Sequence, residues 1–145
     1  MSKETHPIIL GLRQTLRAWT DQDTGPSPAA QRAARFCLAA KSDLLPLLRS
    51  FAEALTAEGL DAMAVSYLSD EDQPAIGLVI EAAEAAITLC PGTTPDGFRV
   101  VASGGALGTT CLERHLPYRL IQSDGVEREL HAVLQRVLLH RPCRY

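Results

Sequence analysis

The distribution of hydrophobic patterns along the chain constrains the fold most strongly. Up to residue 58, apolar residues recur at helical spacing, whereas residues 60–122 hold short β-branched runs separated by polar or glycine-containing turns. Helical spacing returns over residues 124–141. A block of strands between two helical blocks predicts an α+β fold, in which helices flank an antiparallel β-meander.

Three amphipathic helices are expected in the first 58 residues. Thr5 is placed to cap the first, which ends at the polar loop 21–26. Ser27 is the expected cap of the second helix, since a proline follows it at the first helical position. Ser42 is the expected cap of the third, and Gly59 is a natural residue to follow its last turn.

Four to five strands are expected before the final helix. The candidate runs, rich in apolar and β-branched residues, are 64–68, 76–80, 86–89, 98–101 and 117–121. The sequence Glu-Ala-Ala-Glu at 81–84 has good helix chemistry, so residues 75–90 fit either two strands or one helix, and the β-branched residues favour two strands. Asp124 and Glu127 have capping-box spacing ahead of an amphipathic helix that is expected to pack on the sheet.

Length and composition indicate a single domain over residues 1–145, made of a helical part (1–58), a sheet (60–122) and a closing helix (124–141). Apolar residues make up 46% and charged residues 21%, as in ordinary globular proteins. No apolar run approaches the roughly 18 residues that span a membrane. The N-terminus lacks the pattern of a secretory signal, so the expected location is cytoplasmic and the four scattered cysteines are expected to be reduced thiols.

Charge is distributed unevenly along the chain. Lys and Arg are absent between Arg49 and Arg99, an interval that holds nine acidic residues, whereas each end of the chain carries seven basic and four acidic residues. An acidic surface orients and steers a basic partner. The predicted partner-binding residues are Asp70, Glu71, Asp72, Glu81 and Glu84.

The stretch A-S-G-G-A-L-G-T-T at residues 102–110 raises the question of a phosphate-binding loop. A strand is expected before it, but the spacing G-G-x-x-G matches neither the P-loop nor the dinucleotide-binding motif. Pro117 would also end a helix that begins at Thr110 after about two turns. We therefore favour a flexible connection whose glycines adopt positive φ. The alternative is an anion-binding loop formed by Gly104, Gly105, Gly108, Thr109 and Thr110.

Cys111 and His115 are four residues apart and would share one face of a helix. Such a pair can act as a thiolate and an imidazole base, or as two metal ligands. No further ligand stands at the spacing of a zinc site, so we expect neither a metal nor a cofactor. The pair is an alternative reactive site; the favoured interpretation is a buried Cys111 and a surface His115.

The sequence favours a non-catalytic binding or regulatory module, such as an adaptor, an inhibitor or a chaperone-like protein, because no coherent catalytic set is visible. It would engage a basic protein partner through the acidic sheet region, and it can form a homodimer through an amphipathic helix, since Leu139 widens the apolar stripe of the last helix. The alternative is an enzyme, or a small-molecule or anion-binding protein, that uses the 104–110 loop with Cys111 and His115. Nucleic-acid binding is disfavoured, because aromatic residues are only 5% and the acidic middle repels phosphates.

Overall fold

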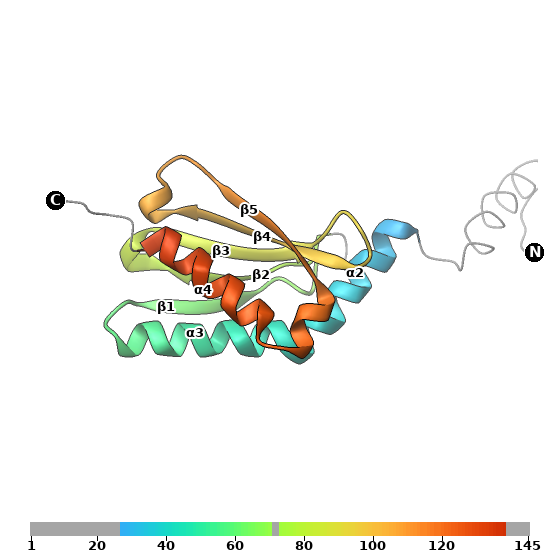
Figure 1. The fold of residues 1–145 in the computed structure, drawn as a ribbon, viewed down its shortest axis with the longest axis horizontal. Coiled ribbons are helices and arrows are strands. Elements are labelled where there is room, and N and C mark those ends of the chain that lie inside the picture. Colours follow the sequence, from blue (N-terminus) through green and yellow to red (C-terminus); the bar gives the residue numbers. More distant parts are fainter. Residues whose placement is uncertain (1–26, 71–72, 139–145) are drawn as a thin grey trace, which may run out of the picture. The chain divides into compact units, whose positions relative to one another are not determined.

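The computed structural model describes residues 27–70 and 73–138 (Figure 1). The chain divides into two compact units, residues 1–31 and 32–145. The α+β class is confirmed, since two helices precede a five-stranded antiparallel sheet and a further helix follows it. The helix predicted to be capped by Thr5 lies outside the described residues, so two of the three expected N-terminal helices are seen. The single-domain assignment stays a prediction.

Helix α2 (Pro28–Ala39) begins as the sequence predicts. The Ser27 hydroxyl oxygen accepts a hydrogen bond from the Ala30 N–H at 3.1 Å, and Pro28 occupies the first helical position, where no N–H is needed. The helical run ends as predicted too, because Gly59 follows α3 (Leu45–Ala57) at a φ of +97°.

The predicted cap at Ser42 is wrong. Helices α2 and α3 are joined without a break by a π-helical turn, Ala40–Leu44, and no side chain caps α3. The Ser42 hydroxyl donates to the Leu38 carbonyl, one turn back in the same run. Pro46 has no N–H to continue the α-helical ladder, and the wider turn, in which the Leu45 N–H bonds to the Ala40 carbonyl, carries the chain past it.

The sheet is a meander in which each strand pairs with the next. Its strands are β1 (Ala62–Ser66), β2 (Ile76–Ile80), β3 (Ala85–Pro91), β4 (Gly97–Gly104) and β5 (Leu112–Pro117). The choice of two strands over residues 75–90 is confirmed, because a 3₁₀ turn at Glu81–Ala83 separates β2 from β3. The strand predicted at 117–121 is wrong, because a 3₁₀ turn occupies Tyr118–Gln122. The last strand, β5, lies earlier, where three consecutive polar residues (Glu-Arg-His) between two leucines hide the strand pattern.

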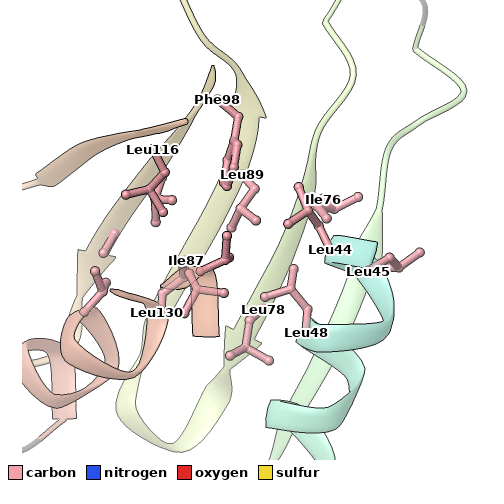
Figure 2. Packing of buried hydrophobic residues seen from close by; sticks show 14 of the residues in the cluster. Leu44, Leu45, Leu48, Ile76, Leu78, Ile87, Leu89, Phe98, Leu116 and Leu130 are labelled. Atoms are coloured by element: carbon pink, nitrogen blue, oxygen red, sulfur yellow. The ribbon is translucent and has the colours of Figure 1, made fainter. Parts of the chain in front are cut away.

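Helices α3 and α4 (Gly125–Leu138) cover one face of the sheet, with α3 running along β1 and α4 crossing the sheet (Figure 1). On that face, alternate residues of β2, β3 and β4 are fully buried. Figure 2 shows Leu44 and Leu48 against Ile76 and Leu78, and Leu130 of α4 beside Ile87. The predicted closing helix is thus confirmed. Helices α3 and α4 both lie on this face of the sheet, so they leave the opposite face uncovered.

Candidate functional site

The second face of the sheet carries the residues that alternate with the buried ones, and we call it the open face. Its side chains are half-buried or exposed, in contrast to the closed face. Strand register places the members in rows across the sheet. They are Met63, Val65, Val79, Ala86, Thr88, Cys90, Arg99, Val101, Ser103, Glu113 and His115.

The open face has two chemically different halves. On β4 and β5, the Glu113 carboxylate accepts hydrogen bonds from the Arg99 guanidinium at 3.5 Å and from His115 Nε2 at 3.1 Å. On β1 to β3 the face carries no charged side chain, and Met63 is 56% exposed. Tyr67, which follows β1 and extends the ladder through its N–H to the Ala75 carbonyl, is 59% exposed. A partner that covered the apolar half would therefore gain free energy, because apolar surface would be removed from water.

The predicted acidic residues are split between two ends of the sheet. Glu81 and Glu84 lie in the β2–β3 turn, whereas Asp70 lies in the β1–β2 connection, where its carboxylate accepts a hydrogen bond from the Gln73 N–H. Residues 71 and 72 lie outside the described part of the chain. The five residues of β2 separate the two ends by about 17 Å. The acids thus flank the apolar half rather than forming one patch.

Glu84 lies in the β2–β3 turn and lines two hollows at this end of the sheet. It adopts the left-handed conformation, with φ 52° and ψ 46°, which is the sole positive φ among the described non-glycine residues. A hollow of about 480 Å³ lies beside it on the open face, lined also by Val79, Glu81, Ala86 and Ser103. A second hollow, which we call the α4 cleft, lies on the other side of the turn.

The α4 cleft has a volume of about 540 Å³, and most of its lining residues are apolar or glycine. It lies between the β2–β3 turn, the β4–β5 turn and the last residues of α4. Its lining residues are Leu60, Ala82, Ala83, Glu84, Gly105, Ala106, Val137 and Leu138. Glu84 is the charged member of this set, and the same residue lines the hollow on the open face.

The glycine stretch forms the β4–β5 connection, as the favoured interpretation predicts. Gly104, Gly105 and Gly108 all have positive φ, and a Cβ at Gly104 would overlap the Glu84 carbonyl oxygen. The amides that would face an anion are engaged in the turn itself: Gly105 N–H donates to Glu84, Gly108 N–H to Gly105, and Thr110 N–H to Leu107. Anion binding by this loop, including Thr109, stays a prediction that the geometry does not support.

Cys111 and His115 do not come together. The helix that would have begun at Thr110 is instead strand β5, and Cys111 precedes its first residue. Four residues of extended chain span about 14 Å, too far for a thiol–imidazole contact. Cys111 is exposed rather than buried, while His115 is exposed as expected.

Tyr118 is a buried titratable group that sequence reasoning missed, because it lay inside a predicted strand. Burial raises its pKa to about 12, an effect that the Arg35 guanidinium opposes and that Cys37 and Cys90 reinforce. Arg35 lies 4.5 Å from the ring centroid, and the Phe98 ring lies 5.4 Å away. The burial of the Tyr118 ring and its contacts with Phe98 and Arg35 indicate a packing role.

Comparisons of the chain with protein-family models, with curated proteins and with solved structures find no match. Within residues 27–70 and 73–138, no group of three or more His, Cys, Asp or Glu side chains is arranged to hold a metal ion. Over the same ranges no helix is long and apolar enough to cross a membrane. The open face and the two hollows at the β2–β3 end of the sheet are therefore the features that bear on function.

Proposed function

We propose that the protein is a non-catalytic protein-binding module. Its apolar half of the open face, over β1 to β3, takes an amphipathic segment of a basic partner protein. The observation that supports this is an apolar sheet surface flanked by acidic turns, with Met63 and Tyr67 more than half exposed. The ion-paired half on β4 and β5 forms the polar border of the interface.

Apolar contact supplies the affinity. Fully burying a side chain such as methionine or valine contributes about 1.5–3 kcal/mol. Met63 belongs to β1 and Tyr67 directly follows it, and β1 carries no charged residue. The opposite edge strand, β5, carries charges and a proline that discourage pairing with another chain. The partner segment therefore lies towards β1 rather than β5.

Charge supplies the orientation. Glu81 and Glu84 are exposed at the end of the apolar half, and Asp61 lies beside them, since its carbonyl accepts the Glu81 N–H at 3.1 Å. A partner lysine or arginine can lay its aliphatic stem across Val79 and Ala86 and place its cation at these carboxylates. Screening by salt weakens such contacts, because the Debye length falls from about 8 Å at physiological ionic strength to about 3 Å at 1 M.

The test is capture of a partner from the host lysate, followed by measurement of its affinity for purified variants. Met63→Lys places a cation in the apolar half and is expected to weaken binding at least tenfold, which corresponds to about 1.4 kcal/mol. Glu81→Gln is expected to reduce the salt dependence of binding.

Leu38→Lys is the matched control, because Leu38 is 68% exposed and undergoes the same chemical change to lysine on helix α2 rather than on the sheet. Both variants replace exposed side chains, so their melting temperatures should stay close to that of the parent. Equal loss of binding in both variants, or loss in neither, would reject the open face as the interface.

A further inference from the structure

The two edges of the sheet differ in chemistry. β1 and β5 each pair with a single neighbouring strand, so each directs a row of backbone N–H and C=O groups away from the sheet (Figure 1). Charged side chains and Pro117 protect this row on β5. β1 reads A-M-A-V-S, without a charge or a proline, and an uncharged edge of this kind is a template for pairing with another chain.

The hydrogen bonds at either end of β1 show which of its residues face the edge. The Tyr67 N–H donates to the Ala75 carbonyl, and the Asp61 carbonyl accepts from the opposite residue of the β2–β3 turn. Odd-numbered residues of this row therefore bond to β2, and in an antiparallel ladder the alternate residues direct their backbone groups outward. The outward residues of β1 are Ala62, Ala64 and Ser66.

The unpaired part of this edge is short and has defined limits. At Ala62, the Thr56 hydroxyl of α3 lies 3.4 Å from the N–H and 3.3 Å from the carbonyl oxygen, and it bonds to both groups. Beyond Ser66, the next outward N–H, that of Leu68, bonds to the Ser66 hydroxyl at 3.5 Å. In the part of the chain that the structure describes, the outward backbone groups of Ala64 and Ser66 have no partner.

We propose that β1 pairs in antiparallel orientation with β1 of a second copy of the chain, so that two sheets become one. The backbone groups of Ala64 bond to those of Ser66 in the second copy, and Ser66 bonds to Ala64 there. This register uses every unpaired outward group. A shift of two residues in either direction would bring Ala62 or Leu68, which are already bonded, into the ladder. The edge is therefore complementary to itself, as a two-fold dimer requires.

The same register pairs the apolar side chains of the open face. Val65 lies on the two-fold axis opposite its own copy, and Met63 lies opposite Tyr67 of the second copy. These pairs are not hydrogen-bonded to each other, and side chains approach most closely in pairs of this kind. Met63 and Tyr67, at 56% and 59% exposure, are two of the three exposed large apolar residues in the described ranges, with Leu38. One register thus pairs the outward backbone groups and removes apolar surface from water.

This pairing goes beyond the proposed function and does not depend on it. Where both hold, the apolar halves of two open faces form one surface around the two-fold axis. Because the copies run in opposite directions, an acidic turn with Glu81 and Glu84 then lies at each end of that surface. Only this consequence rests on the proposed function.

The first experiment is sedimentation of the full-length protein over a range of concentrations, where we expect a dimer at about 100 μM. Ser66→Pro removes an outward N–H and no bond to β2, since proline is tolerated on an edge strand where the N–H faces solvent. It should raise the dissociation constant roughly tenfold or more, because two hydrogen bonds are lost per dimer.

His115→Pro is the matched control on the other edge. The Tyr118 N–H donates to the Asp96 carbonyl, so even-numbered residues of this row bond to β4 and the His115 N–H points outward. Proline at position 115 therefore removes an outward donor from β5, and the dissociation constant should stay that of the parent.

The second experiment tests the register by oxidation of Val65→Cys. Opposite residues that are not hydrogen-bonded have Cα atoms about 4.5 Å apart, which a disulfide can span. We expect a covalent dimer whose peptide map contains a link between the two copies of position 65. Val101→Cys is the matched control, because Val101 is also a half-buried valine of the open face but lies on β4, and it should give no such link.

Three outcomes would overturn the inference. They are a parent that is monomeric at about 100 μM, a dimer that Ser66→Pro leaves intact, and a Val65→Cys variant without a link through position 65. If thermal melting shows that Ser66→Pro is unfolded, the link through position 65 decides alone. Partner binding is tested separately by Glu81→Gln, which lies outside the β1 edge, so failure of the dimer and failure of the proposed function are distinguishable.

Discussion

Replacing Glu84 by glycine should stabilise the protein. A non-glycine residue in the left-handed region costs about 1–2 kcal/mol, and glycine removes that cost. Glycine also makes the unfolded chain more flexible, which takes back about 0.4–1 kcal/mol. The net expectation is a gain of about 0.5–1 kcal/mol, or about 1–4 °C in melting temperature for a domain of this size.

Glu81→Gly is the matched comparison. It removes the same charge from the same turn, but Glu81 sits in the 3₁₀ segment without a positive φ, so glycine there should cost about 0.5–1 kcal/mol. Urea denaturation followed by circular dichroism gives the two midpoints, which should move in opposite directions. If both midpoints shift in the same direction, the effect comes from the lost charge and not from the backbone conformation of Glu84.

Three further outcomes are expected. Leu134→Asp places a carboxylate in the buried face of α4 and should lower the free energy of unfolding by several kcal/mol, of the order seen for unpaired buried charges, measured by thermal melting. Gly104→Ala should destabilise by more than Gly108→Ala, because only the first new Cβ meets the Glu84 carbonyl while the second enters open space; urea midpoints separate them. The pKa of Tyr118 is about 12 in the folded protein against about 10 in the unfolded chain, so the free energy of unfolding should fall as the pH rises from 10 to 12. Tyr118→Phe should remove roughly 2 kcal/mol of this fall, which denaturation curves at several pH values measure.

The parts of the fold that could be predicted are those that local chemistry decides. Ser27 with the following proline specifies a helix start through one hydrogen bond and one fixed φ, and the structure has both. The β-branched runs of β2 and β4 specify strands. The prediction fails where the local sequence does not indicate a strand. Leu112–Pro117 has three consecutive polar residues between two leucines, and this strand is stabilised by its pairing with β4.

The arrangement of the candidate site follows from strand parity, which the sequence shows only when the strand limits are right. The first strand was expected at 64–68 and lies at Ala62–Ser66. Met63 therefore belongs to the strand and lies in a row with Val79 of β2, in register across the open face. The separation of Asp70 from Glu81 has a similar cause, because a hairpin strand places its two turns at opposite ends.

The conformation of Glu84 connects the fold to the proposed binding surface. Gly104 approaches the Glu84 carbonyl so closely that a Cβ at this position would overlap it, and Glu84 itself adopts the left-handed conformation. Glycine or asparagine satisfies such a position at lower cost, so the glutamate is not explained by the turn alone. What it adds is a carboxylate between the open-face hollow and the α4 cleft. If Glu84→Gly raises stability and lowers partner affinity, the strained conformation of Glu84 is linked to binding. If stability rises and affinity is unchanged, Glu84 has no role in binding, and the acidic contact is made by Glu81 instead.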